Sequence, residues 1–353
     1  MPQNEIYLNN LYARVDWLEF TVTDYQPNLN LLDNVAHYLR HIGLHIDLFD
    51  VCGKGGMGYR ATMRHVYENV FIFYDGASAD MGIHIRVSGS SVSYVLSELL
   101  NTTKCDTPFG IVYDVGDYDV TNVLPMFIER VLEVGHFTRI DLAIDDVGTN
   151  YYKVSEVVEK LKSGCLVGKF KKSQNVVSDS VSGGCIGHTL YLGSRESDVF
   201  LRVYEKGLEQ NVPLNWVRWE LEIKHEKADV LARQLLEKQN FGYVAIGVLK
   251  NYIKIVLPDN ARRTRCSLDP KWIEFTGEIE KLRLSLSQKD SSYDDKVNWI
   301  KKQCLPTLAG IIYAQGGDMS IISDDLEVNF DRLKARDKVL FKRKLEECIN
   351  DSK

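Results

Sequence analysis

The chain has 353 residues, of which 44% are apolar, and a formal net charge of −6 at pH 7. This length predicts a large core in two domains, or in one large domain with an appendage. No stretch reaches the run of about 20 apolar residues that spans a bilayer, and the start, MPQNEIYLNN, lacks the basic and apolar regions of a signal peptide. The 7 cysteines are scattered without a CxxC pair, which argues against a zinc site or a disulfide framework. We therefore expect a cytoplasmic protein without membrane contact.

The first part of the chain alternates between strand and helix patterns. RVDWLEFTVT, from Arg14, predicts a strand, and Asn28 to His41 has apolar residues at helical spacing. Further strands are predicted around His45–Cys52, Tyr59–His65, Glu68–Tyr74 and Gly82–Ser88. A helix capped by Ser90 or Ser91 follows. We expect an irregular segment at 105–118 and a helix over Thr121–Val134.

The second part repeats this outline. A strand at Phe137–Asp146 leads to a helix, then to three or four strands and a helix over Glu226–Lys238. Both halves have the predicted order β-α-β-β-β-α, with one strand uncertain, and RVDWLEFTV aligns with RIDLAIDDV. The predicted fold is therefore α+β, a largely antiparallel sheet built from two β-α-β-β-β-α repeats. The Ser- and Gly-rich segment Ser173–His188 is predicted to form a flexible hairpin.

After about residue 240 the pattern becomes helical and densely charged, and no strand is predicted. Helical stretches are expected over Phe241–Ile255, Trp272–Ser287, Tyr293–Gln315 (interrupted at Pro306) and Asp324–Asn350, with a basic loop at Pro258–Pro270. This region is predicted to be a helical C-terminal appendage.

Three predicted strands alternate apolar residues with charged or tyrosine residues, so that each strand has one polar face. These faces comprise Arg139, Asp141, Ala143 and Asp145 in the first strand, Arg202, Tyr204 and Lys206 in the second, and Trp216, Arg218, Glu220, Glu222 and Lys224 in the third. A polar strand face is usually just a solvated surface. Its repetition in three strands, with an ExE pair opposite a DxxxD, favours a functional surface if the strands share one sheet.

The residue types on this surface suit phosphoryl chemistry. Carboxylates on rigid strands are the ligands that a hard divalent cation such as magnesium takes. Arginines and lysines beside them suit a phosphate. A tyrosine can form a covalent intermediate when a metal or a base assists. The combination favours phosphodiester transfer onto a tyrosine.

The stretches that carry this pattern resemble a known family. RIDLAIDD, YLGSRESDVFLRVYEK and WVRWELE look like the replication initiation factor family, which contains rolling-circle plasmid initiators and related relaxases of integrative conjugative elements. The opening RVDWLEFTV resembles the start of that family's catalytic region. The resemblance extends over about Arg14 to Asn240, and the GSRxS–RxYEK block is its most specific part.

The resemblance implies an enzyme that nicks one DNA strand at an origin, through a tyrosine that becomes joined to the 5′ phosphate. It implies Tyr204 as the nucleophile, with Tyr191 as the rival in the same block. Arg202 and Lys206 would hold the phosphate. The implied ligands of the metal, Mg²⁺ or Mn²⁺, are Asp141, Glu220 and Glu222. The implied partners are double-stranded origin DNA with single-stranded or hairpin character at the nick, a host helicase and a second copy of the chain.

The predicted roles divide the chain into three ranges. Residues 1–118 form a non-catalytic repeat, because Asp16 matches Asp141 but Phe20 replaces Asp145. Residues 119–255 form the catalytic repeat, and residues 256–353 the helical region for DNA or partner contact.

Two further observations bear on DNA binding. The net negative charge argues against it, but it hides basic clusters that are candidates for phosphate contact. These clusters are Lys169, Lys171 and Lys172; Arg262, Arg263 and Arg265; and Lys334, Arg336, Lys338, Lys342, Arg343 and Lys344. The alternatives are a relaxase for conjugative transfer with the same chemistry, a metal-dependent nuclease without a covalent step, and a non-catalytic origin-binding protein.

Overall fold

The computed structural model describes most of the chain in two compact units, Met1–Ser285 and Leu286–Lys353. The described residues are 6–8, 11–105 except 25 and 27, 120–149, 151–212, 215–237, 240–277 and 300–319, with single residues beyond 277. All candidate catalytic and metal-binding residues belong to the first unit. The irregular segment predicted at 105–118 lies almost entirely outside the described residues, and the three ranges of roles remain predictions.

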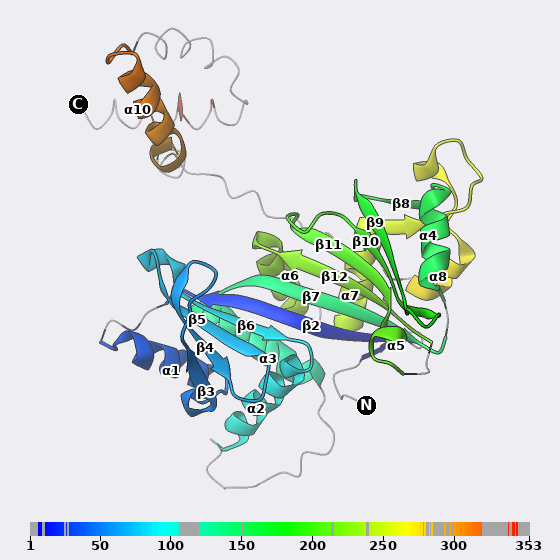
Figure 1. Cartoon of the computed structure of the whole chain (residues 1–353), viewed down its shortest axis with the longest axis horizontal. Coiled ribbons are helices and arrows are strands. Elements are labelled where there is room, and N and C mark those ends of the chain that lie inside the picture. Colours follow the sequence, from blue (N-terminus) through cyan, green and yellow to red (C-terminus); the bar gives the residue numbers. More distant parts are fainter. Residues whose placement is uncertain are drawn as a thin grey trace. The chain divides into compact units, whose positions relative to one another are not determined.

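One antiparallel sheet of 11 strands forms the centre of the first unit (Figure 1). Ten strands follow the order β3-β4-β5-β6-β2-β7-β12-β11-β10-β9, while β1 pairs with β2 and a separate pair is formed by β8 and β13. The strands are β1 (Ile6–Leu8), β2 (Leu11–Val22), β3 (Phe49–Cys52), β4 (Tyr59–His65), β5 (Val70–Gly76), β6 (Ile83–Ser88), β7 (Gly135–Val147), β8 (Leu166–Gly168), β9 (Ser173–Asp179), β10 (Cys185–Leu192), β11 (Val199–Glu205), β12 (Trp216–Lys224) and β13 (Ile253–Ile255).

The strand order is symmetric about the central pair of β2 and β7. In each half the first strand is central, a helix follows, and the next four strands of the sheet return from the outer edge to the centre: β3 to β6 in one half and β9 to β12 in the other. A duplicated unit predicts this arrangement. The predicted α+β fold with one largely antiparallel sheet is confirmed. From β2 and from β7, each half contributes one strand more to this sheet than β-α-β-β-β-α, and β8 is a further strand of the second half outside it. The predicted hairpin at Ser173–His188 is formed by β9 and β10.

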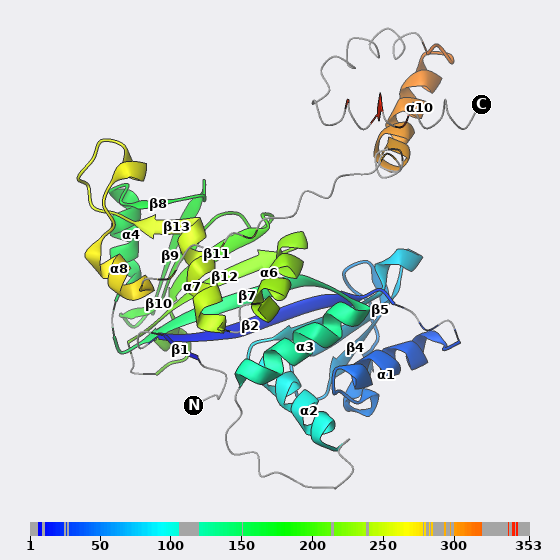
Figure 2. The ribbon, with the colours of Figure 1, turned by 180° about the vertical axis from the view of Figure 1, so that it is seen from behind.

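The helices of the first unit lie mostly on one face of the sheet (Figure 2), while the short α5 (Lys206–Glu209) is drawn in front of the strands in Figure 1. They are α1 (Leu31–His41), α2 (Ser91–Cys105), α3 (Val120–Val134), α4 (Val154–Lys162), α5 (Lys206–Glu209), α6 (Glu226–Glu237), α7 (Phe241–Tyr252) and α8 (Pro270–Thr276), with short 3₁₀ turns at Ile46–Leu48, Ala79–Met81 and Arg263–Arg265. In particular, α3, α6 and α7 contact the central strands. The apolar positions of those strands, such as Phe20, Leu142 and Leu221, are fully buried against them, and each contributes about 1.5–3 kcal/mol.

The opposite face of the sheet, which we call the open face, carries the alternate residues of the same strands. Figure 1 looks onto it, with α6 and α7 behind the strands. Since successive side chains point to opposite faces, a strand that buries Ile140 and Leu142 presents Arg139 and Asp141 on the open face. The pairing register places Trp17 opposite Asp141 and Glu19 opposite Arg139, on the same side.

The region after residue 240 departs from the prediction of helices without strands. The helix predicted over Phe241–Ile255 ends at Tyr252, and β13 follows, because Ile253 and Ile255 are buried on either side of Lys254 at the two-residue period of a strand. The helix predicted over Trp272–Ser287 ends at Thr276, before Gly277 with φ +57°, a conformation that favours glycine.

The second unit contains, among its described residues, a π-helical turn at Ile300–Cys304 and α10 (Leu305–Ala314). Pro306 lies in the first turn of α10, where a missing backbone N–H costs nothing, so the helical stretch changes from the π-helical turn to α10 next to this proline, as the predicted interruption at Pro306 requires. The helix predicted over Asp324–Asn350 lies almost entirely outside the described residues. No helix in the described part of the chain is both long and apolar enough to cross a membrane.

Candidate active site

The predicted carboxylates, the arginine and the tyrosine meet on the open face of β7, β11 and β12. Across β12 and β7, Glu222 is paired with Asp141. Across β11 and β12, Arg202 is paired with Glu220, and Tyr204 with Arg218. Directly paired residues of antiparallel strands have Cβ atoms about 4.5–5.5 Å apart. The structure therefore places these candidates side by side, as the alternation of the strands predicted.

Three buried carboxylates, Asp141, Glu220 and Glu222, form the centre of this site. Arg202 joins two of them, because its Nη2 lies 3.1 Å from Asp141 Oδ2 and 2.5 Å from Glu220 Oε1. Arg139 binds Asp141 through two hydrogen bonds of 2.8 and 2.6 Å and Glu222 through one of 3.0 Å. Lys224 completes the cluster at 2.9 Å from Glu222. Three cations thus balance three carboxylates.

Burial makes the negative charge of this site costly. It raises the pKa of Asp141 to about 7, although Arg139 and Arg202 oppose the shift. Burial also raises the pKa of Glu220, again against Arg202. A carboxyl group that takes up a proton near neutral pH can serve as a general base. The site therefore combines carboxylates that accept protons with cations that can bind a phosphate.

Tyr204 is joined to this cluster through its hydroxyl. Its Oη donates a hydrogen bond of 2.8 Å to Glu220 Oε2. Burial, followed by the charge of Glu220, raises the pKa of Tyr204 far above its usual value. The phenol cannot ionise unaided, but its proton already points at a carboxylate. Lys206 lies over the ring of Tyr204 with its Nζ 5.5 Å from the centroid, and it forms an ion pair with Glu209.

Tyr191 lies on the same face, one strand further out. It is paired with Arg202 across β10 and β11, so both side chains lie on the open face. Alternation along the sequence could not determine this, because the turn between the two strands interrupts it. Its ring stacks on Phe200 at 5.7 Å, and Arg195 lies 6.0 Å from its centroid. Of the two candidate nucleophiles, Tyr204 is the one whose hydroxyl is hydrogen-bonded to a carboxylate of the cluster.

A second ion-pair network, which the sequence did not separate from the first, lies next to the site. Arg218 binds Asp145 through two hydrogen bonds of 2.6 and 2.8 Å, and both side chains are 1% exposed. Arg218 also reaches Asp16 at 2.8 Å, and Trp216 donates to Asp145 at 2.7 Å. Asp145 was grouped with the carboxylates by its position in the strand. Its partners instead tie β2, β7 and β12 together.

Sequence reasoning also missed the part that Arg139 plays in the site. This residue was assigned to the polar face of β7 but to no function, although it holds both Asp141 and Glu222. Its position two residues before Asp141, on the same face of the same strand, was the available signal.

The chemistry of the donors fits a hard divalent cation, since all three candidate ligands are carboxylates on rigid strands. Their oxygens are occupied by arginine and lysine, and no group of three or more His, Cys, Asp or Glu side chains in the described residues is arranged to hold a metal. A cation would therefore compete with Arg139 and Arg202 for the same oxygens. The Nε atom of Arg202 is buried without a hydrogen-bond partner, so this side chain retains a donor for another acceptor.

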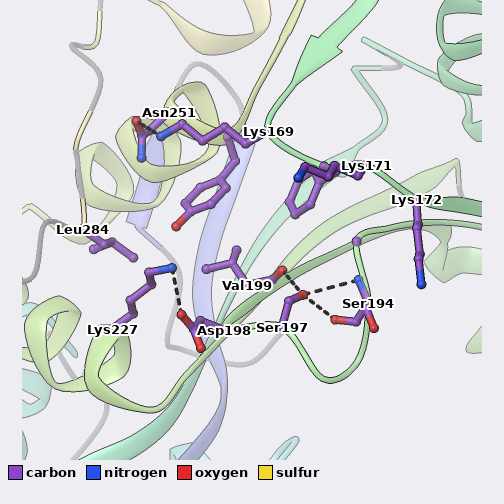
Figure 3. A pocket seen from close by; sticks show the side chains of 13 residues that line it. Lys169, Lys171, Lys172, Ser194, Ser197, Asp198, Val199, Lys227, Asn251 and Leu284 are labelled. Atoms are coloured by element: carbon purple, nitrogen blue, oxygen red, sulfur yellow. Dashed lines mark hydrogen bonds and ion pairs between the residues drawn. The ribbon is translucent and has the colours of Figure 1, made fainter. Parts of the chain in front are cut away.

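A basic pocket of about 700 Å³ lies beside the turn between β10 and β11 (Figure 3). Its lining contains four lysines, Lys169, Lys171, Lys172 and Lys227, against a single carboxylate, Asp198. Lys227 pairs with Asp198 at 3.0 Å, and Lys169 donates to Asn251 at 2.8 Å. Gly193, Ser194 and Ser197 of the turn complete one wall. The pocket thus concentrates positive charge in a chain whose net charge is −6, and it contains the first of the three predicted basic clusters.

Comparison with known proteins gives three consistent matches. The model of the replication initiation factor family matches residues 135–326, which begin at β7 and include the whole carboxylate cluster. The "Putative DNA relaxase NicK" of Bacillus subtilis (strain 168) is 28% identical over 322 residues, which cover 88% of this chain and 84% of the relative. The structure of the rolling circle replication initiator protein from Geobacillus stearothermophilus is 26% identical, with a TM-score of 0.59, over 78% of this chain and 98% of that chain.

Proposed function

Because the chain belongs to the replication initiation factor family, we propose that it nicks one strand of an origin DNA and becomes joined to the 5′ phosphate through Tyr204. The observation that carries this proposal is the hydrogen bond of 2.8 Å from the Tyr204 hydroxyl to Glu220, inside a cluster of buried carboxylates and arginines. It unites a nucleophile, a proton acceptor and phosphate-binding groups on one face of a rigid sheet.

The reaction is an exchange of one phosphodiester bond for another. The Tyr204 oxygen attacks the scissile phosphorus while its proton passes to Glu220. The bond from phosphorus to the 3′ oxygen breaks, and that oxygen leaves with a proton returned from Glu220. The products are a free 3′ hydroxyl and a 5′-phosphotyrosine. Since the number of phosphoester bonds is conserved, the strand can be rejoined without a nucleotide cofactor.

Arg202 is the residue best placed to bind the scissile phosphate. Its Nη2 touches Asp141 and Glu220, and its buried Nε has no partner. A phosphate oxygen that replaced one of these carboxylates on the guanidinium, whose side chain is 24% exposed, would receive a charge-assisted hydrogen bond within the cluster that holds Tyr204. Such a donor offsets the charge that develops on the phosphate during attack. Lys206, next to the ring of Tyr204, is proposed to act on the same phosphate.

We propose that Mg²⁺ or Mn²⁺ assists, held by Asp141, Glu220 and Glu222. When bound, such an ion would polarise the phosphoryl oxygens and favour the ionised phenol. Asp141 must be unprotonated to bind it, and burial raises the pKa of Asp141 to about 7. Metal binding should therefore weaken as the pH falls below about 7.

The decisive experiment incubates the full-length protein with supercoiled DNA carrying its origin, with and without Mn²⁺, and analyses the products under denaturing conditions. We expect relaxed circles with protein attached to the 5′ end, and no product after chelation by EDTA. Nicks without attached protein would identify a hydrolytic nuclease. DNA binding that survives EDTA, without any nicking, would identify an origin-binding protein.

The comparisons favour two processes for the same step. The initiator of G. stearothermophilus suggests rolling-circle replication, and the relative named as a relaxase suggests DNA transfer. We propose replication as the process and conjugative transfer as the second candidate. A plasmid that carries the origin and the gene, but no transfer genes, would replicate in the first case only. A host helicase and a second copy of this chain remain predicted partners.

The basic pocket gives a prediction about DNA affinity. We propose that Lys171 and Lys172 contact the DNA backbone, so replacing both with alanine should weaken binding equally for all sequences. The slope of log affinity against log salt should fall by roughly 1.4 to 1.8, the value for two phosphate contacts. Fluorescence anisotropy at several salt concentrations measures this slope.

The matched control is Lys162→Ala, which removes an exposed lysine at the end of α4, outside the pocket lining. It should leave the slope within error of the original protein. An unchanged slope in the double variant would show that the pocket does not contact DNA.

A further inference from the structure

Cationic and aromatic side chains cross the open face from the N-terminal half to the carboxylates. Residues paired across successive strands carry them: Arg64 with Phe71, Phe71 with Arg86, Arg86 with Glu19, and Glu19 with Arg139. Trp17 lies on the same face, paired with Asp141. We call this set the arginine–aromatic row and define it as Arg64, Phe71, Arg86, Trp17 and Arg139.

The members of the row are in contact as cation–π pairs. The guanidinium of Arg64 lies 5.6 Å from the ring centroid of Phe71. Trp17 lies between two guanidinium groups, at 4.2 Å from that of Arg139 and 5.8 Å from that of Arg86. These distances are within the roughly 6 Å at which a cation and an aromatic ring attract each other. Trp17 Nε1 also donates a hydrogen bond of 2.9 Å to Glu19, so polar contacts help to orient this ring.

The row is accessible, unlike the apolar residues of the same strands. Arg64 is exposed, and Phe71, Trp17 and Arg86 are partly exposed, whereas Ile72 and Val87, next to them in sequence, are fully buried on the helix-covered face. Large aromatic rings on the solvent side of a sheet add little to the core. Bordered by arginines, they are suited to flat, anionic ligands.

The row has the length of a nucleic-acid path. Each of its arginines has an acidic neighbour: Arg64 is paired with Asp50 across β3 and β4, Arg86 binds Glu19 at 2.9 Å, and Arg139 binds Asp141 and Glu222. It crosses β4, β5, β6, β2 and β7, which at about 4.8 Å between strands gives roughly 19 Å. At the roughly 3.4 Å per phosphate of one strand in a duplex, this length corresponds to about six nucleotides, and to fewer in an extended single strand.

The row is continuous with the carboxylate cluster, because Arg139 belongs to both. On the other side of the cluster, Tyr191 stacks on Phe200, and Arg195 lies 6.0 and 5.9 Å from their centroids. The carboxylates therefore lie between two sets of aromatic and cationic residues. A strand that crosses the cluster would meet such a set on either side.

We propose that the arginine–aromatic row binds single-stranded DNA flanking the nick, with a base stacked on Phe71 and phosphates held by Arg64 and Arg86. Single-stranded DNA fits better than a duplex, since only unpaired bases expose their rings for stacking. This inference rests on the proposed function for its link to the nick, and it assigns the N-terminal half a binding role that the carboxylate cluster does not supply.

The test measures the affinity of the full-length protein for labelled (dT)12 and for a 12-base-pair duplex by fluorescence anisotropy. Phe71→Leu keeps an apolar side chain but removes the ring, so single-strand affinity should fall about 5- to 150-fold, the range for one stacked base, with duplex affinity much less affected. Phe71→Tyr keeps the aromatic ring, so its affinity for the single strand should equal that of the original protein. Arg64→Gln should reduce the salt slope on (dT)12 by roughly 0.7.

Two controls match these variants. Tyr67→Ala removes an aromatic ring that is 88% exposed outside the row. Arg60→Gln removes an arginine of the same strand that pairs with Asp75 at 3.1 Å. Both should leave affinity for (dT)12 within about twofold of the original protein, and thermal unfolding should confirm that every variant is folded.

The outcomes separate this inference from the proposed function. Unchanged (dT)12 affinity in Phe71→Leu, or an equal loss on single strand and duplex, would overturn the stacking proposal. A selective loss on the single strand supports it, even if the original protein forms no covalent adduct with origin DNA. That last result would overturn the nicking proposal and leave the row as a single-strand binding surface.

Discussion

Replacing Tyr204 with phenylalanine is expected to abolish the covalent protein–DNA adduct and to slow nicking by roughly 10³-fold or more, the scale on which loss of a nucleophile acts. The change removes the oxygen that forms the new bond and leaves Glu220 Oε2 without its 2.8 Å hydrogen bond. DNA affinity should be nearly unchanged, because Arg202 and the basic pocket are retained. Adduct formation on a denaturing gel, together with DNA binding by anisotropy, measures both quantities.

Tyr191→Phe is the matched control, since it removes a hydroxyl from the same face at the position paired with Arg202. We expect it to retain the adduct with at most a modest loss of rate. If Tyr191→Phe loses the adduct and Tyr204→Phe retains it, the two assignments must be exchanged. Loss in both variants would indicate that Tyr191 positions the phosphate through Arg202.

The fold was predictable because its determinants are local and periodic. Alternation in RIDLAIDD and WVRWELEIK assigned Asp141, Glu220 and Glu222 to polar faces, and the similarity of RVDWLEFTV to RIDLAIDDV predicted a duplicated sheet. The pairing of Glu222 with Asp141 required the order of strands, which alternation alone does not provide. Ile253–Ile255 is too short for its apolar pattern to distinguish a strand from the end of the preceding helix, and the prediction of a helix there was wrong.

The chemistry of individual side chains was much less predictable. Position in the strand made Asp141 and Asp145 equivalent, because both lie on the open face of β7. Only the partners separate them: Asp145 faces Arg218 with 1% of either side chain exposed, whereas Asp141 shares two arginines with two other carboxylates. Arg218 comes from β12 and Asp16 from β2, so this distinction depends on contacts between residues far apart in the sequence.

The same distinction predicts opposite behaviour for two conservative substitutions in one strand. Asp141→Asn should lower the affinity for Mn²⁺ by more than the roughly 10- to 100-fold that loss of an outer partner causes, and nicking should be lost with it. Asp145→Asn should leave Mn²⁺ affinity nearly unchanged. It should lower the free energy of unfolding by about 3–5 kcal/mol, because Arg218 would remain buried without its bidentate partner. Calorimetric titration with Mn²⁺ and unfolding in urea measure the two effects.

The stability of Asp141→Asn should depend on pH in a direction that the pKa fixes. Burial raises the pKa of Asp141 from 3.8 to about 7, so the folded protein binds this proton more tightly than the unfolded chain does. The contribution of this group to stability is therefore greatest below about pH 4 and falls as the pH rises to about 7. Asparagine does not titrate. In EDTA, the stability of Asp141→Asn relative to the original protein should rise between pH 4 and pH 7 and stay level above. A variant that is several kcal/mol less stable at pH 8, yet still binds Mn²⁺, would place Asp141 with Asp145 as a structural residue.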